Sequence, residues 1–137
     1  MLCVDPGKHR CGVARFTRWG VLVSAWLALP DPVTPWDVGE VAIVEVPQVY
    51  QRGKGDPGDL VAIAFAGGRV TALFHNVKKV TPAQWKGQTP KAIHHARVRA
   101  ALDPTEEKIV EAIDCPASLR HNVLDAIAMG LHEFGRI

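Results

Sequence analysis

The stretch VAIVE, residues 41–45, is an apolar and largely β-branched run that ends in a carboxylate directly before Val46-Pro47. Residues of this kind favour strands, and a run without polar interruption is typical of a strand buried on both faces. We therefore predict a central parallel strand over 41–45. The segment before it, residues 30–40, contains three prolines, which disfavour a continuous helix and leave room for a turn around 36–37.

Upstream of this strand, the chain holds three further apolar runs. Residues 2–4 lead into Asp5-Pro6-Gly7, and residues 12–16 follow after a short gap, so we predict two strands joined by a tight connection. Residues 21–29 predict a third strand after the turn at Trp19-Gly20. Three antiparallel strands are therefore expected to open the fold.

Downstream of residue 45, glycines and helical patterns alternate. Residues 48–58 predict an exposed loop, and 60–66 predict a short helix that begins after Asp59 and stops at Gly67-Gly68. Residues 70–74 predict another strand.

Helices are expected in the C-terminal third. Residues 85–87 predict a loop before a helix that starts at Pro90 and runs to residue 100. A second helix is expected from 103–104, and a last one over 121–134 from the spacing of its apolar residues. The whole pattern predicts an α/β chain.

The composition sets the protein class. The chain has 137 residues, of which 47% are hydrophobic and 22% charged, which favours one compact domain over 1–137. It has neither an apolar run of transmembrane length nor a secretory signal at its start, so we expect a cytoplasmic protein. The three cysteines include no C-x-x-C pair and predict neither a disulfide framework nor a zinc finger, and Cys3 and Cys11 are expected in the core.

The charges are unevenly distributed. The net charge of +2 is small, yet residues 60–102 contain no Asp or Glu. The basic residues of that segment are Arg69, Lys78, Lys79, Lys86, Lys91, Arg97 and Arg99, together with His75, His94 and His95. We expect this segment to contact DNA or RNA. The alternative is a solvated surface balanced by the acidic segment 103–114.

Three carboxylates lie at the end of, or inside, otherwise apolar elements: Asp5, Glu45 and Asp125. Singly, they could be a turn former, a strand-end residue and an exposed helical acid. Together they predict a metal site, because grouped and partly buried carboxylates repel one another unless a divalent cation neutralises them. Oxygen ligands favour Mg²⁺.

Two more residues can share that site. His121 lies four residues and Asn122 three residues before Asp125, so both fall on its helix face. Either is a candidate fourth ligand, and a surface or capping role is the alternative for His121.

The run VDPGK (4–8), followed by GVA (12–14), resembles the opening strand of RuvC-like Holliday junction resolvases, in which the first metal carboxylate precedes Pro-Gly. The run VAIVEVPQV (41–49) resembles the strand that ends in the catalytic Glu of that family, and NVLDAIAMG (122–130) resembles its terminal helix. The resemblance extends through VTPAQWK (80–86) and spans nearly the whole chain.

This resemblance implies a ribonuclease H-like fold, with a mixed sheet of about five strands flanked by helices. It also implies a homodimer that resolves Holliday junctions in DNA recombination and repair by paired symmetric nicks, since a two-fold dimer matches the symmetry of the junction. The implied chemistry is Mg²⁺-dependent hydrolysis with two ions, for which Mn²⁺ substitutes. Asp5 bridges the ions, Glu45 and Asp125 complete their coordination, and His121 or Asn122 assists.

The resemblance also implies contacts with DNA. Tyr50 matches the base-stacking aromatic of the family, although an ordinary loop aromatic is the alternative, and Arg52 and Lys54 would contact phosphates beside it. Lys86 or Lys91 would neutralise the phosphate at the site. Lys78 and Lys79 are further expected contacts from the basic segment.

Two departures from the cellular members matter. The connection over 30–40 is shorter than the usual helix, which suits a phage-encoded relative acting in a bacterial or phage-infected cell. Asn122 stands where many members have an acid or His, which leaves a non-cleaving junction-binding module as one alternative. A related nuclease that matures ribosomal RNA is another. An actin-like kinase is disfavoured, because the chain has no second lobe and no second glycine-rich phosphate loop.

Overall fold

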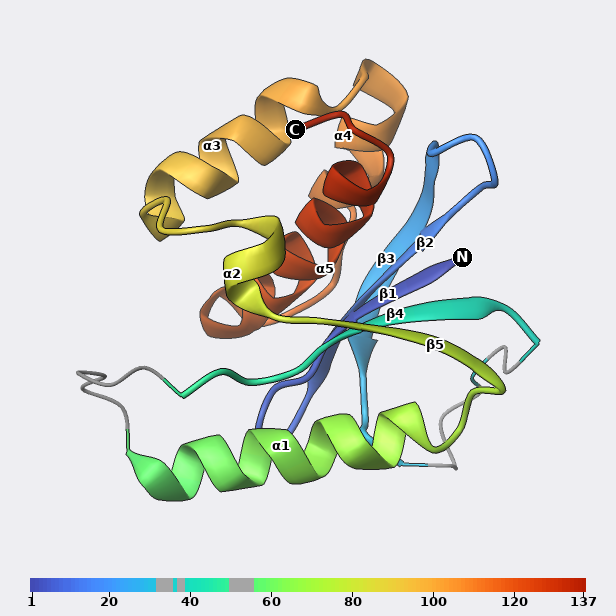
Figure 1. Ribbon diagram of the computed structural model, residues 1–137. Helices are drawn as coiled ribbons and strands as arrows, with labels where there is room; N and C mark the ends of the chain where they lie inside the picture. Colours follow the sequence, from blue (N-terminus) through green and yellow to red (C-terminus); the bar gives the residue numbers. More distant parts are fainter. Residues whose placement is uncertain (32–35, 37–38, 50–55) are drawn as a thin grey trace.

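The centre of the molecule is a mixed sheet (Figure 1). The computed structural model describes residues 1–31, 36, 39–49 and 56–137. In this part of the chain, five strands pair in the order β3-β2-β1-β4-β5. They are β1 (Leu2–Asp5), β2 (Cys11–Phe16), β3 (Leu22–Ala28), β4 (Val41–Glu45) and β5 (Asn76–Val80). The first three are antiparallel neighbours, whereas β4 runs parallel to both β1 and β5, which confirms the central parallel strand.

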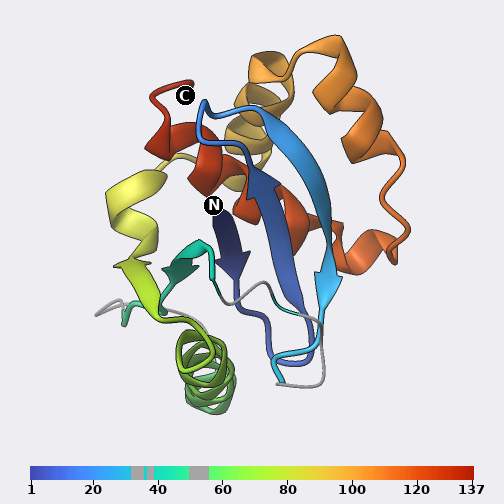
Figure 2. The same cartoon turned by 90° about the vertical axis from the view of Figure 1, so that its right-hand side faces the viewer.

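Helices cover both faces of this sheet. They are α1 (Pro57–Thr71), α2 (Pro82–Trp85), α3 (Lys91–Ala101), α4 (Pro104–Glu111) and α5 (Arg120–Glu133), with the single turn η1 (Ala117–Leu119) before the last. Figures 1 and 2 show α1 alone on one face and the C-terminal helices on the other. None of the helices described is long and apolar enough to cross a membrane.

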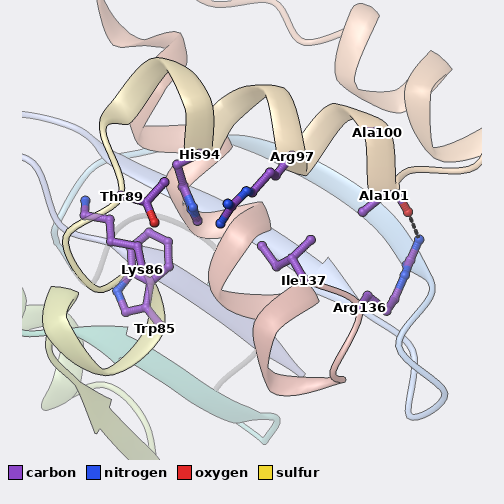
Figure 3. Close-up of a pocket in the computed structure, with 9 residues that line it drawn as sticks. All are labelled: Trp85, Lys86, Thr89, His94, Arg97, Ala100, Ala101, Arg136 and Ile137. Atoms are coloured by element: carbon purple, nitrogen blue, oxygen red, sulfur yellow. Dashed lines mark hydrogen bonds between the residues drawn. The ribbon is translucent and has the colours of Figure 1, made fainter.

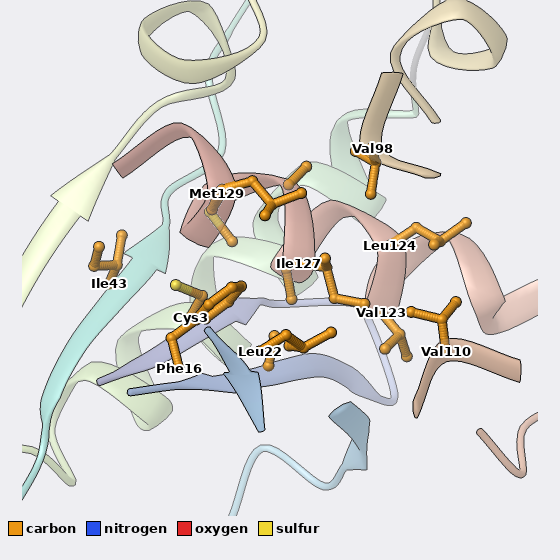
Figure 4. Close-up of a cluster of buried hydrophobic side chains, with 14 of the residues drawn as sticks. Cys3, Phe16, Leu22, Ile43, Val98, Val110, Val123, Leu124, Ile127 and Met129 are labelled. Atoms are coloured by element: carbon orange, nitrogen blue, oxygen red, sulfur yellow. The ribbon is translucent and has the colours of Figure 1, made fainter. Parts of the chain in front are cut away.

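The strands alternate between two cores. Leu2 and Val4 of β1 face α1, whereas Cys3 faces α5, and Ile43 of β4 faces α5 in the same way. The larger core joins the sheet to α5, as Figure 4 shows for Phe16 and other side chains around that helix. The expected core positions of Cys3 and Cys11 are confirmed, since both are fully buried.

Two glycines let α5 lie directly on β2. A Cβ atom at Gly12 would stand 2.0 Å from the backbone oxygen of Asn122, and one at Gly130 would stand 2.0 Å from Cε2 of Phe16. A larger residue at Gly12 would displace the backbone of α5, and one at Gly130 would displace the Phe16 ring. The sequence thereby fixes the distance between α5 and the end of β1.

The helix predicted over 60–66 is wrong in its bounds. It begins at Pro57, capped by Asp56, whose side chain accepts a hydrogen bond of 2.8 Å from the Gly58 backbone, so Asp59 is not the cap. It also continues through Gly67-Gly68. A Cβ atom at Gly67 would lie 3.4 Å from Pro6, so this glycine serves the packing of α1 against the sheet rather than its termination.

The strand predicted over 70–74 is also wrong. Val70 and Thr71 belong to α1, and Val70 is buried beneath the sheet, so the apolar pattern here forms the inner face of a helix. The edge strand β5 starts at Asn76. Trp85, expected in a loop, is the buried last residue of α2.

Candidate active site

Asp5 and Glu45 end neighbouring parallel strands. Val4 pairs with Val44, so the two carboxylates follow at adjacent positions at the same edge of the sheet. The alternation that turns Cys3 and Ile43 toward α5 turns Asp5 and Glu45 to the same face. Asp125 comes from α5, which covers that face. The three acids line one cavity of about 430 Å³.

The acids of this cavity disfavour one another's ionised form. Asp5 is 8% exposed, and burial, followed by the charges of Glu45 and Asp125, raises its pKa well above the usual range. Burial also raises the pKa of Glu45, against the lowering effects of Lys86 and of a hydrogen bond from Trp85. The cavity is therefore built to receive positive charge.

The side-chain rings of Trp85 and His95 contact two of these acids. Nε1 of Trp85 donates a hydrogen bond of 2.8 Å to Oε2 of Glu45, and Nε2 of His95 lies 2.9 Å from Oδ1 of Asp125. Neither residue was assigned to the site from the sequence. The signal for Trp85 is its place in the run VTPAQWK (80–86), and the signal for His95 is its place in the basic segment.

Lys86 and Lys91, which the resemblance places at the phosphate, lie beside Asp125. Their Nζ atoms lie 3.9 Å and 4.0 Å from Oδ2 of Asp125. Lys91 lines the cavity itself, while the ammonium of Lys86 also lies 4.8 Å from the centre of the Trp85 ring. A phosphate at the carboxylates would come within reach of both cations.

His121 and Asn122 also line the cavity. Burial and the nearby Lys91 lower the pKa of His121, so its ring is neutral and able to act as a ligand at neutral pH. The amide nitrogen of Asn122 lies 3.3 Å from the Arg10 carbonyl oxygen and ties α5 to the β1–β2 turn. Which of the two is a ligand stays a prediction.

The other expected DNA contacts lie elsewhere. Lys78 forms an ion pair with Glu133, with a closest approach of 2.6 Å, and Lys79 lines a separate cavity next to α1. Neither lines the carboxylate cavity. Tyr50, Arg52 and Lys54 fall outside the described residues.

The donor set of the cavity suits a hard divalent cation. Three carboxylates from three elements offer oxygen ligands, and their mutual repulsion would be relieved by an ion between them. As the described side chains lie, no group of three His, Cys, Asp or Glu residues encloses a metal position. Glu45 and Asp125 instead face Trp85 and His95, so ion binding requires these carboxylates to turn toward Asp5.

Comparisons with known proteins bear on the fold. No protein-family model and no curated protein matches the sequence. Among solved structures, RuvC of T. thermophilus in complex with a Holliday junction substrate is similar with a TM-score of 0.62 and 18% identity, covering 96% of this chain and 90% of that chain. A second Thermus thermophilus RuvC structure gives a TM-score of 0.55 and 20% identity, covering 96% and 92%. The mixed sheet flanked by helices is therefore the RuvC-like, ribonuclease H-like fold that the family resemblance implies.

Proposed function

We propose that this protein is a metal-dependent endonuclease that resolves Holliday junctions. The observation that carries the proposal is the meeting of Asp5, Glu45 and Asp125 in one cavity, with Lys86 and Lys91 beside them. The likeness in fold to a RuvC seen with a Holliday junction substrate supports branched DNA as the substrate. Recombination and repair of DNA are the corresponding cellular roles.

Each residue of the cavity has a distinct task. Asp5, Glu45 and Asp125 would together hold two Mg²⁺ ions. When bound, the ions activate water, stabilise the leaving oxygen and neutralise the phosphate, and Mn²⁺ can replace them. Lys86 and Lys91 attract the DNA phosphate and balance the charge of Asp125. Trp85 and His95 restrict the orientation of Glu45 and Asp125.

Paired nicks need two sites, and the surface of α1 supports a homodimer. Val61 and Phe65 are 68% and 70% exposed and lie one helical turn apart. Exposed apolar residues on one helix face are typical of an interface between subunits. A two-fold pairing through this face would supply the two cavities that paired nicks need.

The test is a substrate panel with matched variants. Wild type, Asp125→Asn and the control Asp114→Asn, which changes an exposed acid, are each given four labelled substrates with Mg²⁺ or EDTA. The substrates are an immobile four-way junction, matched duplex, single-stranded DNA and structured RNA. We expect paired symmetric nicks in the junction alone, requiring Mg²⁺ and lost only in Asp125→Asn.

Three results would contradict the proposal. Cleavage confined to RNA would assign the protein to RNA processing. Junction binding without nicks at any metal concentration would identify a non-cleaving module. Full activity in Asp125→Asn would show that the carboxylate cavity is not the site of cleavage.

A further inference from the structure

A second cavity, of about 520 Å³, lies between α2, α3 and the C-terminal segment (Figure 3). Trp85 and Lys86 join it to the candidate active site: the Trp85 ring lines this cavity while its Nε1 binds Glu45, and Lys86 lines it while its ammonium lies 3.9 Å from Asp125. Apart from Trp85 and Lys86, the function proposed above uses none of the residues that line this cavity.

The lining of the second cavity is positively charged. It includes Lys86, Arg97 and Arg136, and none of the described residues that line it is an Asp or Glu. The charge of Arg136 is neutralised by Glu106, which does not line the cavity. The guanidinium nitrogens of Arg136 donate hydrogen bonds of 2.6 and 2.7 Å to the two carboxylate oxygens of Glu106. No carboxylate within the described part of the chain pairs with Arg97. The uncompensated charge of the cavity therefore comes from Arg97, and Lys86, whose ammonium lies 3.9 Å from Asp125, is a cation shared with the candidate active site.

His94 adds a buried polar group that lacks a partner. Its side chain is 4% exposed and packs edge-on against Trp85, with ring centres 5.1 Å apart. Its Nε2 atom has no hydrogen-bond partner among the described residues. Leaving such a group unsatisfied carries a desolvation penalty that a bound ligand oxygen would relieve. In Figure 3 the nitrogen-bearing ends of His94 and Arg97 converge in the middle of the cavity.

We propose that this cavity binds a phosphate group, held by the charges of Arg97 and Lys86 and by hydrogen bonds from His94 and Thr89. A guanidinium recognises phosphate oxygens in two-point fashion, and a ligand oxygen beside it would satisfy the unpaired imidazole nitrogen. The volume admits a nucleotide. The source we favour is the DNA backbone next to the phosphate at the carboxylates, which rests on the proposed function. A free nucleotide offers the same chemistry.

The chain supplies a matched pair of variants. Arg97 and Arg99 both belong to the basic segment and are exposed residues of α3, but only Arg97 lines the cavity, so the proposal assigns the phosphate contact to Arg97 and none to Arg99. We would measure the Kd of a fluorescent four-way junction by anisotropy in EDTA, so that cleavage plays no part, at several salt concentrations. Arg97→Ala should weaken binding about ten-fold and lower the slope of log Kd against log salt by about one, whereas Arg99→Ala should change Kd less than about two-fold. Equal losses in both variants, or none in Arg97→Ala, would overturn the DNA source.

Calorimetric titration with dAMP and with inorganic phosphate tests the other source. Saturable binding of dAMP to wild type, lost in Arg97→Ala and in His94→Phe but kept in Arg99→Ala, would place a free nucleotide in the cavity even if no junction binds. Failure of that outcome as well as the anisotropy outcome would overturn the proposal. If both binding tests fail but Arg97→Ala and Arg99→Ala still cleave the junction, the phosphate-binding proposal is wrong and the proposed nuclease function stands. Failure of this proposal is therefore distinguishable from failure of the proposed function.

Discussion

At the scale of single residues, Asp5 bears an electrostatic cost. It is almost fully buried beside two other carboxylates. We expect Asp5→Asn to raise the free energy of unfolding by about 1 to 2 kcal/mol in EDTA, because a buried repelling charge is removed. Thermal unfolding measures this. Mg²⁺ should raise the Tm of wild type and leave that of the variant unchanged.

The control for this prediction is Asp114→Asn, which removes an exposed acid and should behave like wild type with and without Mg²⁺. A lower Tm for Asp5→Asn in EDTA would show that Asp5 stabilises the metal-free fold, which contradicts a cavity whose acids repel one another until a cation binds.

Trp85 offers a second prediction at this scale. Trp85→Phe keeps a buried ring but removes the 2.8 Å hydrogen bond to Glu45. We expect the rate constant of junction cleavage to fall about ten-fold, because groups that orient metal ligands have effects of this size. The Kd for the junction should not change. Trp19→Phe, at a 76% exposed position, is the control and should have no effect on the rate.

The sequence indicated the three acids because each interrupts or ends an apolar pattern, which is a local signal. It could not indicate Trp85 as the partner of Glu45 or His95 as the partner of Asp125. Those contacts join residues 40 and 30 positions apart and depend on where α2 and α3 dock.

At the scale of elements, the close approach of α5 to β2 gives a paired prediction. Gly12→Ala places a methyl group 2.0 Å from a backbone oxygen and should lower the free energy of unfolding by about 2 to 3 kcal/mol. Gly68→Ala in α1 meets nothing within 4 Å and should raise it by about 0.5 to 1 kcal/mol, since alanine favours a helix. Denaturant unfolding measures both, and the same sign of change for the two variants would refute this packing.

Most elements followed from sequence patterns, and the two errors over residues 60–74 have one origin. Residues 60–74 have glycines and β-branched residues that locally favour a helix end followed by a strand. The packing of α1 against Pro6 and the sheet decided otherwise, since Gly67 is needed for close contact and Val70 for burial. A pattern confined to neighbours in sequence does not contain that information.

At the scale of the whole molecule, Glu106 connects distant parts of the chain. Its carboxylate, 1% exposed, accepts hydrogen bonds from Arg136 and from the Leu22 backbone. The bonds from Arg136 are the main cause of a pKa lowered to about 2. Glu106→Gln should lower the free energy of unfolding by about 2 to 4 kcal/mol at neutral pH, because a buried charge pair loses one partner.

The lowered pKa of Glu106 predicts how the stability difference between wild type and Glu106→Gln depends on pH. An acid whose pKa is lower in the folded state stabilises the fold above its ordinary pKa, 4.5, and this stabilisation is lost as the pH falls toward about 2. The gap between wild type and Glu106→Gln should therefore shrink across this window in denaturant titrations. A gap that stays constant with pH, or one matched by the exposed control Glu107→Gln, would show that the ion pair is not its cause.

The most direct test of the proposed metal site is the position of a bound ion in a crystal soaked with Mn²⁺. We predict anomalous density at about 2 Å from carboxylate oxygens of Asp5, Glu45 and Asp125, with Glu45 and Asp125 turned from Trp85 and His95 toward the ion. The same soak of Asp5→Asn crystals should leave this position empty. Density at other residues only, or none in well-ordered wild-type crystals, would contradict the assignment of this cavity as a metal-dependent nuclease site.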